Sequence, residues 1–454
     1  MEFHAWAPLF YFPRRYLNLT TCVNNSHYEK FQDGTVKCIE DEIPFEVPEG
    51  WSWARLRDIC MMSAGKSKST VQIKSEPFEG SYPCFGGNGV RGYVDEYNQD
   101  GIFSIVGRQG ALCGNINIAI GKFYATEHAV VTTLFDGIDF KWSNYILEAL
   151  RLNNYATGAA QPGLSVANIL NVFVPVPPTQ EQDRIGNSVY ESLKIVEALE
   201  QEKIDLQKNI ITAKTKILDL AICGKLVPQD PNDEPASVLL ERIRAEKEEL
   251  IKHGKIKRDK KESVIFKGDD NSYYGIHLPD SWNWASLREI ALSISDGSHN
   301  PPPNNGSGIP LLSAANINDN SILMNEISRW ITNEEWKIEN QRTNIEVGDV
   351  LLTIVGSIGR SAVVQNNNHF ALQRSVAVIK PCLINPLYLM HIVQSPQIQK
   401  WLTDNSKGTA QKGIYLNALS LMIIPIPPLA EQARIVELIH IAYKHLDLIS
   451  NALL

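Results

Sequence analysis

The chain has 454 residues, of which 44% are hydrophobic and 21% are charged. These fractions are ordinary for a protein that folds in water, so they exclude wholesale disorder and an integral membrane class. The formal net charge of −8 argues against phosphate binding over the whole surface, but it does not exclude a local nucleic-acid-binding face. Seven cysteines are scattered along the chain without a C-x-x-C pair, which favours a reducing compartment over a disulfide framework or a zinc site.

Residues 1–44 form an N-terminal segment, of which we expect residues 1–20 to be irregular; from Ser26-x-Tyr28 to Trp51 the sequence parallels Ser272-x-Tyr274 to Trp282. Pro8 and Pro13 interrupt its apolar stretch, and Arg14 and Arg15 follow that stretch, whereas a secretory signal has its basic residues first. No later run reaches the roughly 18 apolar residues of a membrane span. We therefore expect a cytoplasmic chain without a membrane partner.

Two copies of one frame follow along the chain. Val47–Ile59 (VPEGWSWARLRDI) and Leu278–Ile290 (LPDSWNWASLREI) share Pro, Trp-x-Trp, Leu and Ile, and we call this the opening motif. Each copy ends on a closing motif, Pro-x-Pro-Pro-x-x-Glu-Gln, whose last residues are Glu181-Gln182 and Glu431-Gln432. A long internal repeat decides the whole fold, so we expect two domains of similar construction.

Inside the frame the copies share a few glycines and little else. Short β-like runs separated by glycine fill residues 45–178 and 277–428, which predicts two loop-rich mixed α/β domains at these bounds. Both are rich in Asn, Gln, Ser and Gly, a composition that permits the reading of base edges. The matched positions are Gly107 and Gly110 with Gly356 and Gly359, and Gly158, Gln161 and Gly163 with Gly408, Gln411 and Gly413.

A long helix is predicted for residues 179–224 and a shorter one for residues 429–454. Their apolar residues recur at alternating steps of four and three, which is typical of a coiled-coil seam. We expect an antiparallel coiled coil that gives the domains a pseudo-two-fold arrangement; the alternative is an amphipathic helix that lies on its own domain. The seam consists of Ile185, Val189, Val196, Leu199, Leu206, Ile210, Ile217 and Leu220 in the first helix, and of Ile435, Ile439, Leu446, Ile449 and Leu453 in the second.

Residues 225–276 are predicted as a charged linker. Pro228, Pro231 and Pro235 end the preceding helix, and Ser237 or a neighbour can cap a short new one. The tract Lys252–Lys261 is strongly basic. A solvated connector is the favoured interpretation, with contact to phosphate as the alternative.

No complete catalytic motif is present in the sequence. Phe85-x-Gly87-x-Gly89 imitates the glycine loop that binds S-adenosylmethionine, but the residues after it indicate a strand or hairpin instead of the required helix. In the run Asn300–Pro303 a proline replaces the aromatic residue that amino-methyltransferases stack on a flipped base. We therefore expect a non-catalytic chain that itself binds no cofactor and no metal.

The opening motif, the closing motif and the run Gly224–Lys261 (GKLVPQDPNDEPASVLLERIRAEKEELIKHGKIKRDKK) together resemble the specificity subunit of type I restriction-modification enzymes. The match spans nearly the whole chain, and its motifs occur in order and twice. The resemblance implies two target recognition domains, each reading one half of a split DNA sequence, and conserved helices that set the spacing and dock two methyltransferase subunits. One departure from the family is that the second helix is much shorter than the first.

The resemblance also implies the partners of the chain. We expect double-stranded DNA, methyltransferase subunits and restriction or translocase subunits, in a complex that defends the cell against foreign DNA. That complex would use S-adenosylmethionine for methylation, and ATP with Mg²⁺ for restriction. The sequence leaves two other functions open: a tandem DNA adenine methyltransferase, and a protein-binding scaffold that reads no DNA.

Loop residues near the internal glycines are the candidate DNA contacts. Arg, Gln and Asn can pair with base edges, and Lys can bind phosphate. The candidates are Lys66, Lys68, Asn88, Arg91, Arg108 and Gln109 in the first domain, and Ser298, His299, Asn316, Arg360, Gln373 and Arg374 in the second.

Overall fold

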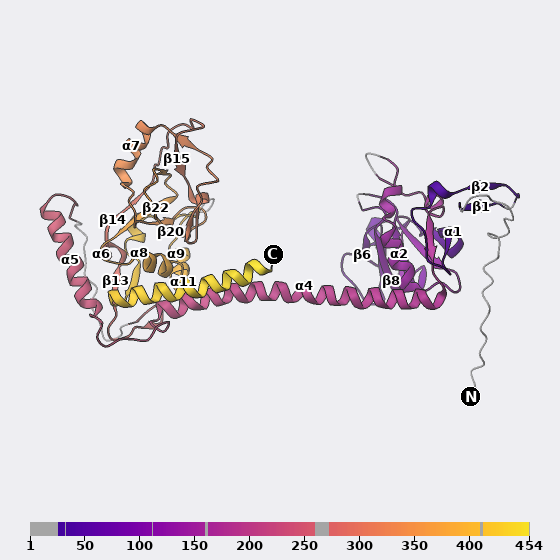
Figure 1. Ribbon diagram of the computed structural model, residues 1–454, viewed down its shortest axis with the longest axis horizontal. Helices are drawn as coiled ribbons and strands as arrows, with labels where there is room; N and C mark the ends of the chain where they lie inside the picture. Colours follow the sequence, from indigo (N-terminus) through magenta and orange to yellow (C-terminus); the bar gives the residue numbers. More distant parts are fainter. Residues whose placement is uncertain are drawn as a thin grey trace. The chain divides into compact units, whose positions relative to one another are not determined.

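The computed structural model describes residues 26–31, 33–110, 112–158, 162–258, 272–408 and 412–453. The chain divides into two compact units, Met1–Glu200 and Gln201–Leu454, which we call unit 1 and unit 2 (Figure 1). Predictions for residues 1–25, for the end of the basic tract after residue 258, and for Gln161 and Gln411 lie outside the described residues.

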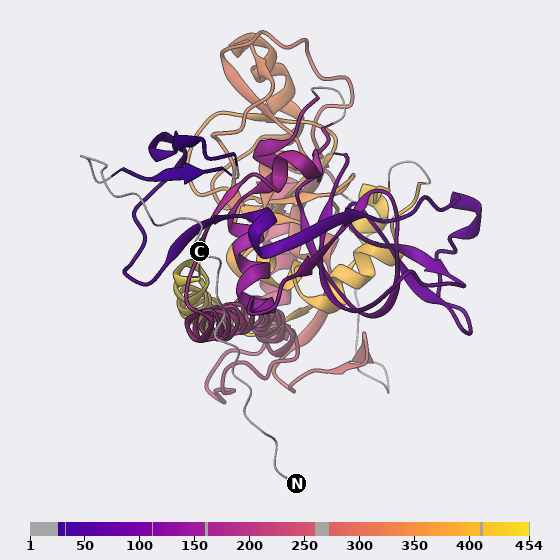
Figure 2. The same ribbon diagram turned by 90° about the vertical axis from the view of Figure 1, so that its right-hand side faces the viewer.

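A six-stranded sheet forms the centre of unit 1, in the order β4-β9-β7-β8-β5-β6. Its strands are among the indigo to purple arrows of Figure 2. Neighbouring strands are antiparallel except β5 and β8, which run parallel. Ile105 and Val106 follow each other in β7 but join different buried clusters, because successive side chains of a strand point to opposite faces. The strands are β4 (Cys60–Ala64), β5 (Tyr82–Gly86), β6 (Gly89–Val94), β7 (Gln99–Gly107), β8 (Ile116–Ala125) and β9 (Ala129–Leu134).

The opening and closing motifs of each copy pair as antiparallel strands. The second Trp of the opening motif lies opposite the first Pro of the closing motif in both units. Proline is tolerated there because each pair is a two-stranded sheet of edge strands. The pairs are β3 (Ser52–Arg55) with β10 (Phe173–Val176) in unit 1, and β13 (Asn283–Ser286) with β23 (Ile423–Ile426) in unit 2.

A short hairpin precedes each opening motif. The irregular segment predicted for residues 1–20 lies outside the described residues. Buried Glu29 attaches the first hairpin to β3, because its carboxylate accepts two hydrogen bonds from the guanidinium of Arg55 in that strand. The hairpins are β1 (Tyr28–Lys30) with β2 (Val36–Cys38), and β11 (Ser272–Tyr273) with β12 (Ile276–His277).

Unit 2 contains smaller sheets than unit 1. Four strands have the order β14-β22-β19-β20, three have the order β18-β15-β21, and β16 pairs with β17. The strands are β14 (Ala291–Asp296), β15 (Ile309–Leu312), β16 (Ile317–Asn318), β17 (Ser321–Ile322), β18 (Trp330–Ile331), β19 (Val350–Thr353), β20 (Ser361–Val363), β21 (Ala371–Leu372) and β22 (Val376–Pro381).

Short helices cover the sheets of both units. Asp139 begins α2 by accepting a hydrogen bond from the Trp142 N–H, and Asn385 begins α8 in the same way. Among the described helices, none is both long enough and apolar enough to cross a membrane. The short helices are α1 (Leu56–Ile59), α2 (Phe140–Ala149), α3 (Val166–Ile169), α6 (Leu287–Ile290), α7 (Asn333–Thr343), α8 (Pro386–Val393), α9 (Pro396–Asp404) and α10 (Leu416–Leu419).

The short helix predicted near Ser237 within the charged linker is α5 (Ala236–Lys252), and it is packed against unit 2. Leu239, Leu240 and Ile243 are buried in the core of unit 2, since residues three and four positions apart share one face of a helix. The prediction of a merely solvated connector is therefore wrong for this stretch. Its charged face remains on the outside, as the exposed Glu241 illustrates.

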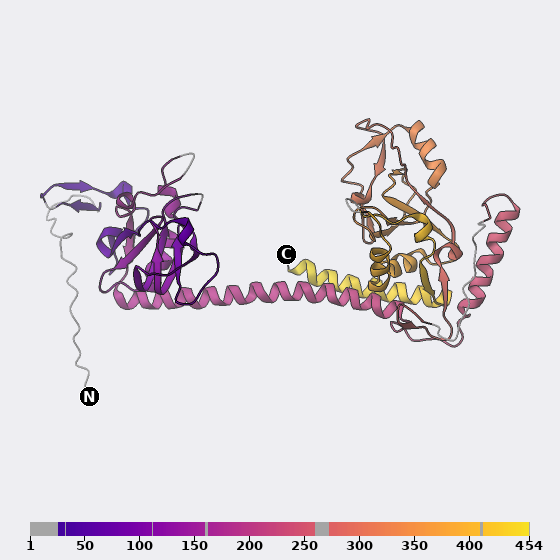
Figure 3. The same ribbon diagram turned by 180° about the vertical axis from the view of Figure 1, so that it is seen from behind.

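The predicted long helix is α4 (Thr179–Ile222), and the predicted shorter helix is α11 (Leu429–Ala452). In unit 2, α11 lies beside the C-terminal part of α4 (Figures 1 and 3). Their direction is antiparallel, because Lys214 pairs with Asp447 while Asp233, beyond the end of α4, pairs with Arg434.

The seam residues of α4 are buried only where α11 lies beside them. Ile210, Ile435 and Ile439 are buried, whereas Val196 and Leu199 in α4 are 49% and 59% exposed. The predicted pairing along the whole seam is therefore corrected to its C-terminal part. The reason is length, since α4 has 44 residues and α11 has 24. Two other seam residues, Leu206 and Ile449, are exposed. The remaining ones are partly buried: Ile185, Val189, Ile217, Leu220, Leu446 and Leu453.

Candidate nucleic-acid interface

Three loops of unit 1 meet at one end of the six-stranded sheet. They are the β5–β6 turn, the segment after β7 and the turn between β8 and β9. The Arg108 N–H donates to the His128 carbonyl at 2.9 Å, and the Thr126 N–H donates to the Phe85 carbonyl at 3.0 Å. Glycine permits this approach: a Cβ on Gly107 would lie 2.0 Å from the Gly87 carbonyl oxygen.

These loops line a cavity of about 460 Å³ that contains three of the six predicted contacts of the first domain, Asn88, Arg91 and Gln109. All three side chains are exposed. Asn88 accepts a hydrogen bond from the Asn115 side chain at 2.7 Å. The arrangement presents donors and acceptors of the kind that pair with base edges.

Arg91 and Arg108 have unneutralised charges. Neither forms an ion pair with any residue that the structure describes. A guanidinium without an internal carboxylate partner is free to bind a phosphate or the O6/N7 edge of guanine. The structure thus brings Arg91 and Arg108 into one loop cluster, and their contact with DNA stays a prediction.

The two predicted lysines of the first domain differ from each other. Lys66 is exposed. Lys68 has a side chain only 7% exposed, and its ammonium pairs with Glu96 at 2.7 Å and with Asp95 at 3.8 Å. The hydrogen bond to Glu96 raises the pKa of Lys68. Its charge is already balanced within the fold, so Lys68 is a poor candidate for a phosphate contact.

The false glycine motif of the sequence is part of this cluster. Gly87 and Gly89 belong to the turn and start of the β5–β6 hairpin, and no helix begins after them. A cofactor loop of the S-adenosylmethionine type must open a helix whose N-terminus faces the ligand. The Gly87–Gly89 turn therefore lacks the helix that a tandem methyltransferase would need for binding S-adenosylmethionine there.

Unit 2 places its corresponding loops in the same way. The N–H groups of Lys66 and Ser298 donate to the carbonyls of Ala125 and Leu372, at 3.0 and 2.7 Å. A Cβ on Gly65 would lie 2.1 Å from the Ala125 carbonyl oxygen, and a Cβ on Gly297 would lie 2.1 Å from the Leu372 carbonyl oxygen. Lys66 of unit 1 therefore corresponds to Ser298 of unit 2.

Gln373 and Arg374 join Ser298 at this edge. Ser298 forms a β-bridge with Gln373, and the Arg374 N–H donates to the Ser298 carbonyl at 2.9 Å. Arg374 is exposed and has no ion pair among the described residues. The structure thus brings these three predicted residues together.

The side chains of Ser298, His299 and Asn316 are engaged within the fold. The Ser298 hydroxyl donates to Glu339 at 3.1 Å, and His299 lies 2.8 Å from an Asp296 oxygen. Asn316 is 3% exposed, and its amide donates to the Glu326 carbonyl and accepts from the Ser313 N–H. Asn316 therefore holds its loop together and is not available to a ligand in this structure.

The register of the repeat differs from the sequence alignment near Arg360. Gly110 and Gly356 hold equivalent places, because their N–H groups donate to the carbonyls of Pro162 and Lys412, which precede Gly163 and Gly413. The predicted match of Gly107 with Gly356 is therefore wrong, since loops of different length shift the glycines. Arg108 and Gln109 correspond to Ile354 and Val355, and Arg360 lies elsewhere, beside Asn318 at 3.3 Å.

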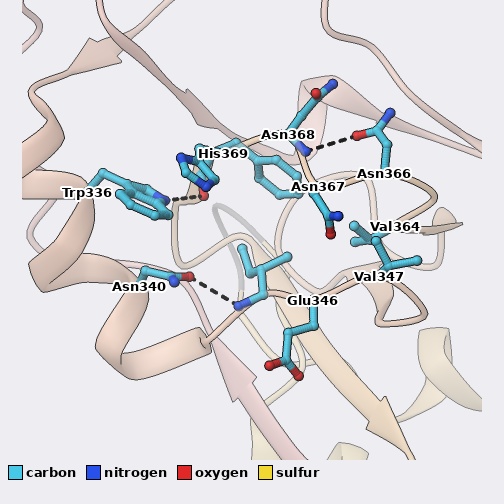
Figure 4. Close-up of a pocket in the computed structure, with 11 residues that line it drawn as sticks. Trp336, Asn340, Glu346, Val347, Val364, Asn366, Asn367, Asn368 and His369 are labelled. Carbon is cyan, nitrogen blue, oxygen red and sulfur yellow. Dashed lines mark hydrogen bonds between the residues drawn. The ribbon is translucent and has the colours of Figure 1, made fainter.

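A second polar cluster in unit 2 was missed by the sequence interpretation. Trp336 of α7 stacks on His369 at 4.1 Å between ring centroids, next to Asn366, Asn367 and Asn368 (Figure 4). These residues line a cavity of about 250 Å³. The polar run that precedes β21 was the available signal, since amides presented on a loop suit base reading.

The part of the chain that the structure describes contains no candidate metal site. No group of three or more His, Cys, Asp or Glu side chains there is placed to hold an ion. The two loop clusters can thus offer hydrogen bonds, positive charge and a stacked aromatic pair to a ligand.

The family described as the type I restriction modification DNA specificity domain matches residues 48–216 and 279–453. The chain belongs to this family. Each match starts at an opening motif and extends into the helix after a closing motif, so the two matches coincide with the two copies of the repeat.

Similar proteins include two specificity subunits from Escherichia coli. The chain is 39% identical to the EcoprrI specificity subunit over 186 residues, which cover 38% of this chain and 44% of that protein. It is 24% identical to the EcoEI specificity subunit over 93% of this chain and 83% of that protein.

Solved structures share the fold. The HsdS subunit from Thermoanaerobacter tengcongensis aligns with a TM-score of 0.52 at 17% identity, over 90% of this chain and 93% of that one. A chain from a study of the assembly and conformational transition of the type I R-M system aligns with a TM-score of 0.53, also at 17% identity, over 90% of this chain and 94% of that one.

Proposed function

We propose that this chain is the non-catalytic DNA-recognition subunit of a type I restriction-modification complex, in which each domain reads one half of a bipartite site. The observation that supports this most strongly is a common frame with different loops. Equivalent loops meet in the same way in both units, yet Arg108 and Gln109 in unit 1 correspond to Ile354 and Val355 in unit 2. A frame of this kind suits two readers of different sequences.

The chemistry of the exposed loops suits duplex DNA. Asn88, Arg91 and Gln109 face one cavity in unit 1, and Gln373 and Arg374 share one edge in unit 2. Arginine and amide side chains form bidentate pairs with guanine and adenine in the major groove. Only these local faces need positive charge, which is compatible with a net charge of −8 for the whole chain.

The helices would set the spacing between half-sites and dock methyltransferase subunits. A helix of 44 residues measures about 66 Å along its axis. We propose that restriction or translocase subunits join the same cytoplasmic complex. S-adenosylmethionine, and ATP with Mg²⁺, would be bound by those partners and not by this chain.

A domain replacement tests the proposal directly. Residues 45–178 are exchanged for the corresponding interior of a related subunit, and the preferred DNA of the assembled methyltransferase is determined by selection from a random library. We expect one half-site to change and the other to remain. A change in both half-sites, or no preference for any sequence, would contradict the assignment.

A helix insertion tests the role in spacing. Four residues inserted after Leu206 add about 6 Å and just over one turn, so the longer helix should prefer one or two more unread base pairs between unaltered half-sites. A binding assay across a series of spacers measures this preference. An unchanged optimum would mean that α4 is a passive tether.

A further inference from the structure

Backbone hydrogen bonds join three segments of unit 2 into one edge. The Ile354 N–H donates to the Ser375 carbonyl at 2.9 Å, and the Gly356 N–H donates to the Lys412 carbonyl at 3.1 Å. Segments that are paired in this way lie about 5 Å apart, so their side chains are neighbours. We call these segments together the unit 2 edge, which comprises residues 354–356, 373–375, 407–408 and 412–413.

Three cationic side chains lie on the unit 2 edge: Arg374, Lys407 and Lys412. All three are exposed, and none forms an ion pair with any residue that the structure describes. Lys407 and Gly413 exchange two backbone hydrogen bonds of 2.8 Å each, which keeps Lys407 close to Lys412. Because the edge itself contains no Asp or Glu, the three positive charges add together.

The centre of the unit 2 edge is apolar. Ile354 is 3% exposed, and Val355 is partly buried. A Cβ on Gly413 would lie 3.3 Å from the Val355 side chain, so Val355 packs against the backbone of the neighbouring segment. The side chains at this centre offer no hydrogen bonds, and the positive charges lie on either side of it.

Unit 1 has uncharged residues at the positions of the two lysines. Thr157 corresponds to Lys407, because the N–H of each donates to the carbonyl of the glycine that closes its loop, at 2.9 and 2.8 Å. Pro162 corresponds to Lys412, because each directly precedes that glycine. The lysine pair is therefore a property of unit 2.

The third cation of the unit 2 edge is replaced by an acid in unit 1. Glu127 corresponds to Arg374, because the carbonyl of the next residue accepts the N–H of Arg108 in unit 1 and of Ile354 in unit 2, both at 2.9 Å. Unit 1 thus has its cation at the centre of the edge, as Arg108, and none at the three outer positions. Unit 2 has the reverse arrangement.

We propose that Lys407 and Lys412 bind phosphates of the DNA backbone at the half-site of unit 2, and that unit 1 makes no such contact from the equivalent positions. A lysine ammonium is a compact point charge that binds phosphate whatever base lies beside it. Arg374 adds to the positive charge of the same edge. This inference rests on the proposed function and extends it, since the two half-sites are then held by different chemistry.

The dependence of DNA affinity on salt tests the proposal, because each phosphate contact contributes about 0.9 to the slope of log affinity against log salt concentration. The full chain is titrated with a labelled duplex that carries the site selected from the random library. The double variant Lys407→Gln, Lys412→Gln should lower the slope by about 1.8, so that its loss of affinity between about 50 and 200 mM salt is about tenfold smaller than that of the native chain. Its base preference should remain unchanged.

Two further double variants are the controls. Lys225→Gln with Lys444→Gln removes the same charge from two exposed lysines outside the edge, which have no ion pair among the described residues either, and should leave the slope as it is. Lys407→Arg with Lys412→Arg keeps both charges and should also keep the slope. Circular dichroism checks that each variant is folded, which we expect because the four lysines are exposed.

A gain of charge in unit 1 tests the same idea from the other side. Thr157→Lys places an ammonium at the position of Lys407, and the slope should rise by about 0.9. Thr157 is exposed and pairs with Gly163 through its backbone, so the substitution does not remove that pairing. Thr157→Gln is the control for side-chain size and should leave the slope unchanged.

Two results would overturn the proposal. One is a slope of the Lys407→Gln, Lys412→Gln variant that equals the native slope or that of the Lys225→Gln, Lys444→Gln control. The other is a changed base preference at one half-site with an unchanged slope, because the two lysines would then read bases. A native chain that binds every duplex equally would instead contradict the proposed function, and slopes measured with a random duplex would still show whether the two lysines bind phosphate.

Discussion

The two units have nearly identical frames and different interiors. Gln182 accepts a hydrogen bond from the Asp139 N–H at 2.8 Å, and Gln432 accepts one from the Asn385 N–H at 2.9 Å. Each glutamine also donates to a proline carbonyl of its closing motif, at 2.9 and 3.1 Å. Between these frames, one unit has a six-stranded sheet and the other has smaller sheets. The frame therefore fixes a domain to its helix, and the interior can diverge without disturbing that attachment.

The largest effect is expected where both interiors share a tight backbone approach. Gly65→Ala and Gly297→Ala should each lower the free energy of unfolding of their unit by about 3 kcal/mol or more, because the new Cβ would lie 2.1 Å from a carbonyl oxygen. Chemical denaturation measures the loss. Gly163→Ala is the control, since its nearest contact would be an ordinary 3.8 Å. If one of these two alanine substitutions left the free energy of unfolding unchanged, the two loops would not be structurally equivalent.

The shared glutamines should come next. Gln182→Leu and Gln432→Leu each remove two hydrogen bonds of a buried side chain, one from a partly buried backbone N–H and one to a proline carbonyl. The expected destabilisation is about 2–3 kcal/mol. Urea unfolding of each variant gives the value. Clearly unequal losses would show that the two frames are alike in geometry but not in energy.

A pH effect should distinguish the units. Burial lowers the pKa of His391 in α8 to about 4, with Gln394 acting in the opposite direction, and unit 1 has Tyr145 at the equivalent place. Below the unfolded pKa of about 6.5 the unfolded chain takes up a proton that the folded chain refuses, so stability is lost as pH falls from about 6.5 to 4. The loss is about 2 kcal/mol at pH 5.

His391→Phe should remove this part of the pH dependence. Unfolding free energies at pH 7 and pH 5 are compared for the native chain and the variant, so that contributions of other groups cancel. An equal loss in both proteins would show that His391 is accessible to a proton in the folded state.

The smallest expected effects concern DNA recognition by the differing loops. Arg108→Ala should reduce discrimination at one half-site by about 1–2 kcal/mol, whereas Ile354→Ala at the equivalent place in unit 2 should leave base preference unchanged. Lys68→Ala should change affinity by less than about 0.5 kcal/mol, because Glu96 and Asp95 already pair with that lysine. Competition binding with single-base variants of the site measures all three, and a large effect of Lys68→Ala would contradict the structural assignment.

The sequence nominated Asn88, Arg91 and Gln109 singly, for the chemistry of their side chains. Only the structure places them around one cavity, and their contact with DNA stays a prediction. The sequence could not predict that Lys68 and Asn316 are occupied, because their partners lie many positions away: Glu96 is 28 residues from Lys68, and the carbonyl of Glu326 is 10 residues from Asn316.

The sequence by itself determined the two-copy organisation, the long helix and the family, because repeated motifs and a three-four apolar period are local properties of the chain. The tertiary structure alone decided which glycines correspond, which charges remain free and how far the helices pair. Loop lengths shift the register between Gly110 and Gly356, and hydrogen bonds between distant residues determine which side chains remain free. Helix pairing depends on where α11 ends against α4, and this leaves Val196 and Leu199 exposed although their pattern matches that of the buried Ile435 and Ile439.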